Sequence, residues 1–199
     1  MKKYIMTLIL ILCFGANAKD LSSFYLDSTS RVLFAGERHI NDRARDIFSD
    51  SLQSFKDSGG DTLGLEMVES HKQYLLDNFL EERENSEFEL YEYLRVRWQY
   101  NTKNYMKLIT RAKSLELKLL AIDLDKRKWP AETALYPVPP DISKVRVARE
   151  AHMAKLLCRA DFQRIIVIIG SFHSLKEYLP SGLRNECYAD SATFDITSL

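Results

Sequence analysis

Two histidines of the sequence stand three residues after a glycine that ends an apolar run. They form the motifs Gly36–Glu37–Arg38–His39 and Gly170–Ser171–Phe172–His173. Glu37 lies inside the first Gly-x-x-His motif, and Glu66 follows another apolar run. Imidazole nitrogen and carboxylate oxygen can hold a divalent metal that activates water, or act on water directly as general base and acid. Both chemistries are open to Glu37, His39, Glu66 and His173.

Short apolar runs are the elements that must position these side chains. Four runs are nearly continuous and rich in Val, Ile or Leu, which is typical of parallel strands covered on both faces. They are Arg31–Ala35, Thr62–Leu65, Leu117–Ile122 and Arg164–Ile169, and a last strand is expected at Thr193–Thr197, after Pro180–Ser181–Gly182. Ligands of such sheets bind beyond the carboxyl ends of the strands. We therefore predict an α/β domain with a mostly parallel central sheet flanked by helices, and a pocket at this rim.

Helical spacing of apolar residues marks the segments between the strands. One helix is expected over residues 44–55, three over residues 74–80, 88–98 and 105–115, and another that Asp141 caps and that ends near Arg159. The three middle helices exceed what a crossover needs, so they form a helical insertion after the second strand. Their aromatic residues either line an apolar cavity or pack the helices together. Residues 129–140 hold four of the five prolines and are expected to form a surface loop.

Other polar residues near the strand ends allow two readings each. Asp123 and Asp125 belong to the site, or they cap the next element and pair with the cations that follow them. Arg38 steers an anion or is merely solvated. His71 and His152 fall in helical segments, where we expect surface or partly packed positions.

The first 18 residues are typical of a secretory signal peptide. A basic head, Met1–Lys2–Lys3, precedes an apolar stretch, and Ala16–Asn17–Ala18 offers the small residues that signal peptidase requires. Leu12 is too bulky to precede a lipidated Cys13, so cleavage after Ala18 is favoured over lipoprotein anchoring. We expect residues 19–199 to form a single exported domain, in the periplasm, with no membrane span after cleavage.

Charge and cysteine content narrow the partners. Loss of Lys2 and Lys3 leaves 26 basic and 28 acidic residues, a formal charge of −2, which favours neither nucleic acid nor an anionic membrane. The expected partner is a small molecule. Cys158 and Cys187 either form a disulfide in an oxidising compartment or remain small core residues. No pattern in the sequence sets the oligomeric state.

The order of these motifs resembles the superfamily that joins Tiki proteases, erythromycin esterases, TraB-type proteins and ChaN. The body of the chain is most similar to the ChaN branch, the haem-binding uptake lipoproteins. The likeness spans about residues 31–175 and includes the two Gly-x-x-His motifs, Glu66–Met67, Leu76–Asp77–Asn78–Phe79–Leu80, residues 98–105 and 149–154.

The resemblance implies a shared pocket of Glu37, His39, Glu66 and His173, with Arg149 as a charged supporter. Its ChaN side implies that haem or a divalent metal binds there, in iron or haem handling. Its Tiki and esterase side implies a metal-assisted or histidine-assisted hydrolase of esters, lactones or peptides, in which the same five residues are catalytic. The haem ligand of the ChaN branch is a tyrosine. Its equivalent here stays open among five tyrosines, namely Tyr91, Tyr93, Tyr100, Tyr105 and Tyr178.

Overall fold

The computed structural model describes residues 20–129, 143–197 and 199. The expected leader, Asp141 and the expected loop beyond Trp129 lie outside these residues. The described chain forms one five-stranded parallel sheet with the strand order β3-β2-β4-β1-β5, which confirms the predicted α/β class. Its strands are β1 (Val32–Glu37), β2 (Thr62–Glu69), β3 (Lys118–Asp123), β4 (Ile165–Gly170) and β5 (Ser191–Asp195).

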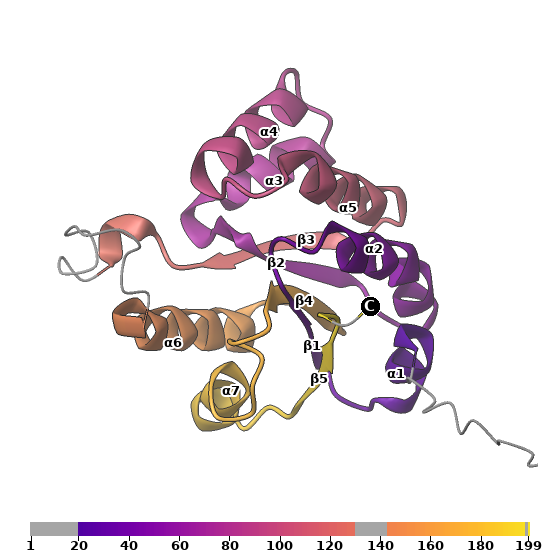
Figure 1. The fold of residues 1–199 in the computed structure, drawn as a ribbon, viewed down its shortest axis with the longest axis vertical. Helices are drawn as coiled ribbons and strands as arrows, with labels where there is room; N and C mark the ends of the chain where they lie inside the picture. Colours follow the sequence, from indigo (N-terminus) through magenta and orange to yellow (C-terminus); the bar gives the residue numbers. More distant parts are fainter. Residues whose placement is uncertain (1–19, 130–142, 198) are drawn as a thin grey trace, which may run out of the picture.

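Helices connect the strands and cover both faces of the sheet (Figure 1). They are α1 (Leu21–Asp27), α2 (Asp42–Asp57), α3 (Gln73–Leu80), α4 (Ser86–Arg97), α5 (Thr102–Ser114), α6 (Ser143–Arg159) and α7 (Leu179–Cys187), with 3-10 turns η1 (Ser70–Lys72) and η2 (Lys126–Lys128). Helices α3, α4 and α5 lie between β2 and β3, which confirms the predicted insertion. Within the described ranges, no helix has the length and apolar character needed to cross a membrane.

One local prediction needs correction, and two helices were not predicted. Glu66 does not follow β2 but lies inside it, because the strand continues to Glu69 past an irregularity in its pairing with β3. No helix was predicted around Pro180, but this segment begins helix α7, whose first turn tolerates proline because the missing N–H has no partner there anyway. Helix α1 was not predicted, and Asp20 caps it by accepting a hydrogen bond from the backbone N–H of Ser23.

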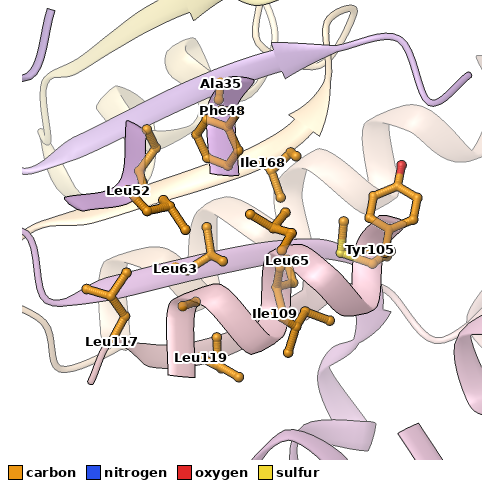
Figure 2. Close-up of a cluster of buried hydrophobic side chains, with 14 of the residues drawn as sticks. Ala35, Phe48, Leu52, Leu63, Leu65, Tyr105, Ile109, Leu117, Leu119 and Ile168 are labelled. Atoms are coloured by element: carbon orange, nitrogen blue, oxygen red, sulfur yellow. The ribbon is translucent and has the colours of Figure 1, made fainter. Parts of the chain in front are cut away.

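Alternate strand residues face two separate hydrophobic layers, as side chains of a pleated sheet must. Leu63, Leu65 and Ile168 pack against Phe48 of α2 and Ile109 of α5 (Figure 2). On the other face, the neighbouring strand residues pack against α6 and α7; this layer includes Val167, Ile169, Met153, Leu157 and Leu183. Because both faces are covered, the rim formed by the strand ends is left for ligands.

The edge strand β3 is capped by a side chain. The amide of Gln73, the first residue of α3, donates to the carbonyl of Leu119 at 2.8 Å and accepts from the N–H of Ala121 at 2.7 Å. This side chain therefore makes the pair of hydrogen bonds that a neighbouring strand would make.

A disulfide joins the two helices on the second face. Cys158 of α6 and Cys187 of α7 are bonded, with their Cα atoms 5.9 Å apart. Of the two alternatives left open by the sequence, the structure has the bridge.

Candidate functional site

The three central strands β2, β4 and β1 bring the predicted residues to one rim. Glu37 is the last residue of β1 and pairs in register with Gly170, the last residue of β4. A Cβ on Gly170 would lie 3.1 Å from Nε2 of His39 and 3.6 Å from Oε2 of Glu66. Glycine is therefore needed here because the imidazole and a carboxylate approach the backbone closely.

A hydrogen-bond network inside the protein fixes Glu37. Its Oε1 accepts from the Tyr105 hydroxyl at 2.6 Å, and its Oε2 accepts from Nε of Arg45 at 3.0 Å. Arg45 is fully buried on α2 and also donates to the carbonyl of His39 at 2.8 Å. Burial and the charge of Glu37 raise the pKa of Tyr105. Glu37 is thus an anchored carboxylate whose role is to hold its neighbours.

His39 is the neighbour that this carboxylate orients. Its Nδ1 lies 3.0 Å from Oε1 of Glu37, so Nδ1 donates and Nε2 points away from the pair. Among the described residues, Nε2 has no hydrogen-bond partner. Burial alone would lower the pKa of His39, but the hydrogen bond to Glu37 and the charges of Glu66 and Glu37 outweigh it and raise the pKa.

Glu66 is held from two sides. Its Oε2 accepts from the backbone N–H of Gly170 at 2.6 Å, and its Oε1 accepts from Arg149 at 2.7 Å. Burial would raise the pKa of Glu66, but the charge of Arg149, the charges of His173 and His39 when protonated, and the Gly170 N–H lower it to about 2. Glu66 is therefore ionised at neutral pH.

His173 is locked, unlike His39. Its Nδ1 lies 2.9 Å from Oε1 of Glu150, and its Nε2 lies 3.2 Å from Nη1 of Arg149. Because a guanidinium only donates, Nε2 of His173 accepts this hydrogen bond. Nδ1 therefore carries the hydrogen and donates a hydrogen bond to Glu150. Arg149 also donates to Oδ1 of Asp123 at 2.7 Å, so one guanidinium joins three site residues.

A cavity of about 670 Å³ opens beside these groups. Its lining includes His39, Glu66, Gly170 and His173. Aromatic and basic side chains complete the wall, namely Trp98, Tyr100, Trp129, Phe172, Arg97, Lys126, Arg146 and Arg149. Cavities of this size hold small organic ligands or cofactors.

Three donors of the cavity wall lack acceptors. In the part of the chain that the structure describes, the buried side-chain atoms without a hydrogen-bond partner are Nε1 of Trp98, Nε1 of Trp129 and Nε of Arg146. Buried polar groups normally have partners. All three are donors and all three belong to residues that line this cavity, so the cavity fits a ligand rich in acceptor oxygens.

The aromatic residues of the helical insertion were predicted either to line a cavity or to pack the helices together, and the structure contains both kinds. Trp98 and Tyr100 line the cavity, and their ring centroids lie 4.7 and 5.2 Å from that of His39. Leu94 and Tyr105, by contrast, are buried in the core. The two cavity residues lie in the connection between α4, which ends at Arg97, and α5, which begins at Thr102.

The four predicted metal ligands do not converge on one point. Over the described ranges, Glu69, His71 and Asp125 are the one group of three metal-type side chains whose ligand atoms all lie within 4.8 Å of one another. Glu37 and His39 form one hydrogen-bonded group, while Glu66 and His173 form another through Arg149.

The open alternatives for the remaining residues are now assigned. Asp125 accepts from the backbone N–H and the side chain of Arg127, so it caps η2. Asp123 is fully buried and belongs to the Arg149 network. His152 is partly packed, with its Nε2 2.8 Å from the Ser70 hydroxyl, and Arg38 is exposed.

Sequence reasoning missed Arg45, Glu150 and Trp129 as site residues, whereas Trp98 belongs to the aromatic segment for which it left cavity lining open. Arg45 carried a usable signal, because it shares helical spacing with Ser49 and Leu52 on the buried side of α2. A charged residue on such a face needs a buried partner. Glu150 and Trp129 have no comparable signal in a single sequence.

Comparison with known proteins extends these findings. The model of the haem-binding uptake family ChaN, in the Tiki superfamily, matches residues 27–131. No curated protein matches the chain.

Solved structures share the fold. ChaN of Campylobacter jejuni, described for its cofacial haem binding, is 14% identical over 83% of this chain and 81% of its own, with a TM-score of 0.60. The type III effector HopBA1 is 17% identical over 72% of this chain and 67% of its own, with a TM-score of 0.55. RRSP, a toxin effector domain from Vibrio vulnificus, is 18% identical over 84% of this chain but 34% of its own, with a TM-score of 0.57. These likenesses show the fold alone.

The family match covers more than half of the chain, including Glu37, His39 and Glu66. This chain belongs to the ChaN family of haem-binding uptake proteins in the Tiki superfamily.

Proposed function

We propose that this chain is an exported haem-binding protein and that haem occupies the cavity beside His39. The carrying observation is the set of unpaired donors on Trp98, Trp129 and Arg146. They lie among flat aromatic side chains and cations, a combination that suits a planar ligand with carboxylates.

The cavity residues meet the chemical demands of haem. Aromatic walls suit the macrocycle, and the cations Arg97, Lys126 and Arg146 suit the propionates. Bound haem would supply an iron that tyrosine or histidine can ligate. His39 offers a free Nε2, and Tyr100, which is 40% exposed, lines the same cavity.

The other four candidate tyrosines have different surroundings. Tyr105 is buried and donates to Glu37, and the hydroxyl of Tyr93 accepts from the N–H of Glu69. Tyr91 lines a separate pocket between α3 and α4, and Tyr178 packs against Phe172. Tyr100 is therefore the proposed tyrosine ligand.

Titration with haemin, followed by visible absorption, tests this function. We expect saturable binding with one spectrum, which Tyr100→Phe or His39→Ala changes and the exposed control Tyr188→Phe does not. Arg146→Gln should weaken binding about tenfold, since a hydrogen bond to a charged group contributes about 1.5 kcal/mol. If every cavity variant binds haem as the wild type does, haem does not bind in this cavity.

The export proposal has separate support. The disulfide between Cys158 and Cys187 is typical of an oxidising compartment, and the leader at residues 1–18 would deliver the chain there. We propose that residues 19–199 act as a single domain in the periplasm. Thiol counting on protein recovered from the periplasm should find no free cysteine.

One observation favours hydrolysis as a second candidate function. The Glu37 carboxylate on Nδ1 of His39 leaves Nε2 facing the cavity, the arrangement of a general base that activates water. His173 cannot take this role as placed, because Arg149 occupies its Nε2. A panel of esters, lactones and peptides tests the candidate: turnover should be abolished by His39→Ala, and absence of turnover across the panel would count against it.

A further inference from the structure

A second group of chemically suited side chains lies where β2 and β3 end, outside the four predicted residues. Glu69 is the last residue of β2, His71 follows in η1, and Asp125 precedes η2. Each offers one ligand atom, and these three atoms lie within 4.8 Å of one another.

The spacing of the three atoms is close to that of metal ligands. Nδ1 of His71 lies 3.8 Å from Oε2 of Glu69 and 3.7 Å from Oδ2 of Asp125. These distances are too long for hydrogen bonds. Ligands about 2.0–2.1 Å from a tetrahedral zinc ion lie about 3.4 Å from one another. The two distances from His71 exceed this value by about 0.3–0.4 Å, and the distance between the two carboxylate oxygens is within 4.8 Å.

Glu69 supplies an acceptor that is aimed at this point without a donor. Its side chain is more than nine-tenths buried, and Oε1 accepts from Nε of Arg97 and from the N–H of Lys126. Among the residues described, Oε2 receives no hydrogen bond, and Nδ1 of His71 lies 3.8 Å from it. One oxygen of this carboxylate is thus engaged, while the carboxylate also offers a ligand atom within 4.8 Å of those of His71 and Asp125.

Asp125 is held by a displaceable partner. Arg127 donates to both of its carboxylate oxygens, but that side chain is 77% exposed, and such surface pairs contribute little free energy. A metal at Oδ2 would therefore cost little in lost ion pairing. The hydrogen bond from the Arg127 N–H to Oδ1 would continue to orient the carboxylate.

We propose that Glu69, His71 and Asp125 bind a divalent transition-metal cation of the zinc type. One imidazole and two carboxylates suit such ions, and the fourth position would be left to water. The ion would tie the end of β2 to the segment after β3, which carries Lys126 and Trp129 into the cavity wall. This site is distinct from the haem proposal and does not depend on it.

Calorimetric titration of the mature chain with zinc chloride tests the site. The chain should carry no histidine tag and should be treated with a chelator first. We expect one equivalent of zinc to bind to the wild type and to the controls His39→Ala and His152→Gln. The variants His71→Ala and Asp125→Asn should bind at least tenfold more weakly. His71 is partly exposed, so its removal should leave the fold intact, which a thermal unfolding curve would verify.

Cobalt substitution gives an independent readout. Co²⁺ bound to the wild type should show visible absorption bands that His71→Ala removes and His152→Gln keeps. Zinc binding that is lost in His39→Ala but kept in His71→Ala would overturn the proposal, as would the absence of saturable zinc binding to the wild type.

Discussion

The two Gly-x-x-His motifs share a sequence pattern but differ in surroundings. His39 is hydrogen-bonded at one nitrogen and presents the other to the cavity, whereas His173 is hydrogen-bonded at both. A buried arginine supports each motif, Arg45 from α2 at the first and Arg149 from α6 at the second. The comparison teaches that a repeated motif need not have repeated surroundings: the first leaves one imidazole nitrogen without a partner among the described residues, and in the second both nitrogens are engaged.

Removing Arg149 should have the largest effect on the second motif. Arg149→Ala leaves Glu66 and Asp123 buried without their shared cation, which should lower the free energy of unfolding by about 3–5 kcal/mol. Urea denaturation measures this loss. Arg149→Lys should retain part of the stability, because a single ammonium replaces the fork of donors incompletely.

The neighbouring Arg146 provides the control on the same helix. It lies on α6 with a partly exposed side chain, so Arg146→Ala should cost much less. Equal losses for Arg146→Ala and Arg149→Ala would show that the Arg149 network does not stabilise the fold.

Opening the disulfide should have the next largest effect and should act on the second motif only. The bond closes a loop between residues 29 positions apart, so replacing both cysteines by serine should lower stability by about 3 kcal/mol. Hydrogen exchange should accelerate in α6, which carries Glu150, and in α7, which follows His173. It should remain unchanged in α2. Faster exchange in α2 to the same extent would contradict this separation of the two sides.

The protonation of His39 should give the smallest effect and the sharpest test of the first motif. Its pKa is raised, so the protonated form stabilises the folded state. That contribution is complete below the unfolded pKa of about 6.5 and is lost as the pH rises through the folded pKa. The stability difference between wild type and His39→Gln should therefore shrink above pH 6.5, by about 0.5–1 kcal/mol.

Nuclear magnetic resonance of the imidazole protons measures the same property directly. The His39 resonance should have a titration midpoint above 6.5. His152 provides the matched control, because burial and the charge of Lys128 lower its pKa. A His39 midpoint at or below that of His152 would remove the argument that Glu37 and Glu66 prepare His39 for protonation.

The sequence predicted the fold where local patterns decide it. Continuous apolar runs such as Ile165–Ile169 identify buried parallel strands, and the ends of such strands must share one rim, which located Glu37 and Glu66. Helix α7 was not predicted; Pro180 lies in its first turn, where proline is tolerated although it breaks the interior of a helix.

What the sequence could not supply was the pairing of charges. Whether Glu66 faces a metal or a guanidinium depends on Arg149, which approaches from α6, 83 residues further along the chain. The same holds for Arg45 and Glu37, whose bond depends on how α2 packs on the sheet. These contacts are tertiary, so a single sequence leaves both arrangements open.

The amide of Gln73 has a consequence beyond the single molecule. An uncovered edge strand offers its N–H and carbonyl groups to any other extended chain and so invites aggregation. At β3 the carbonyl of Leu119 and the N–H of Ala121 are already engaged by this side chain. A second copy therefore cannot extend the sheet at these positions, so Gln73 blocks intermolecular strand addition there.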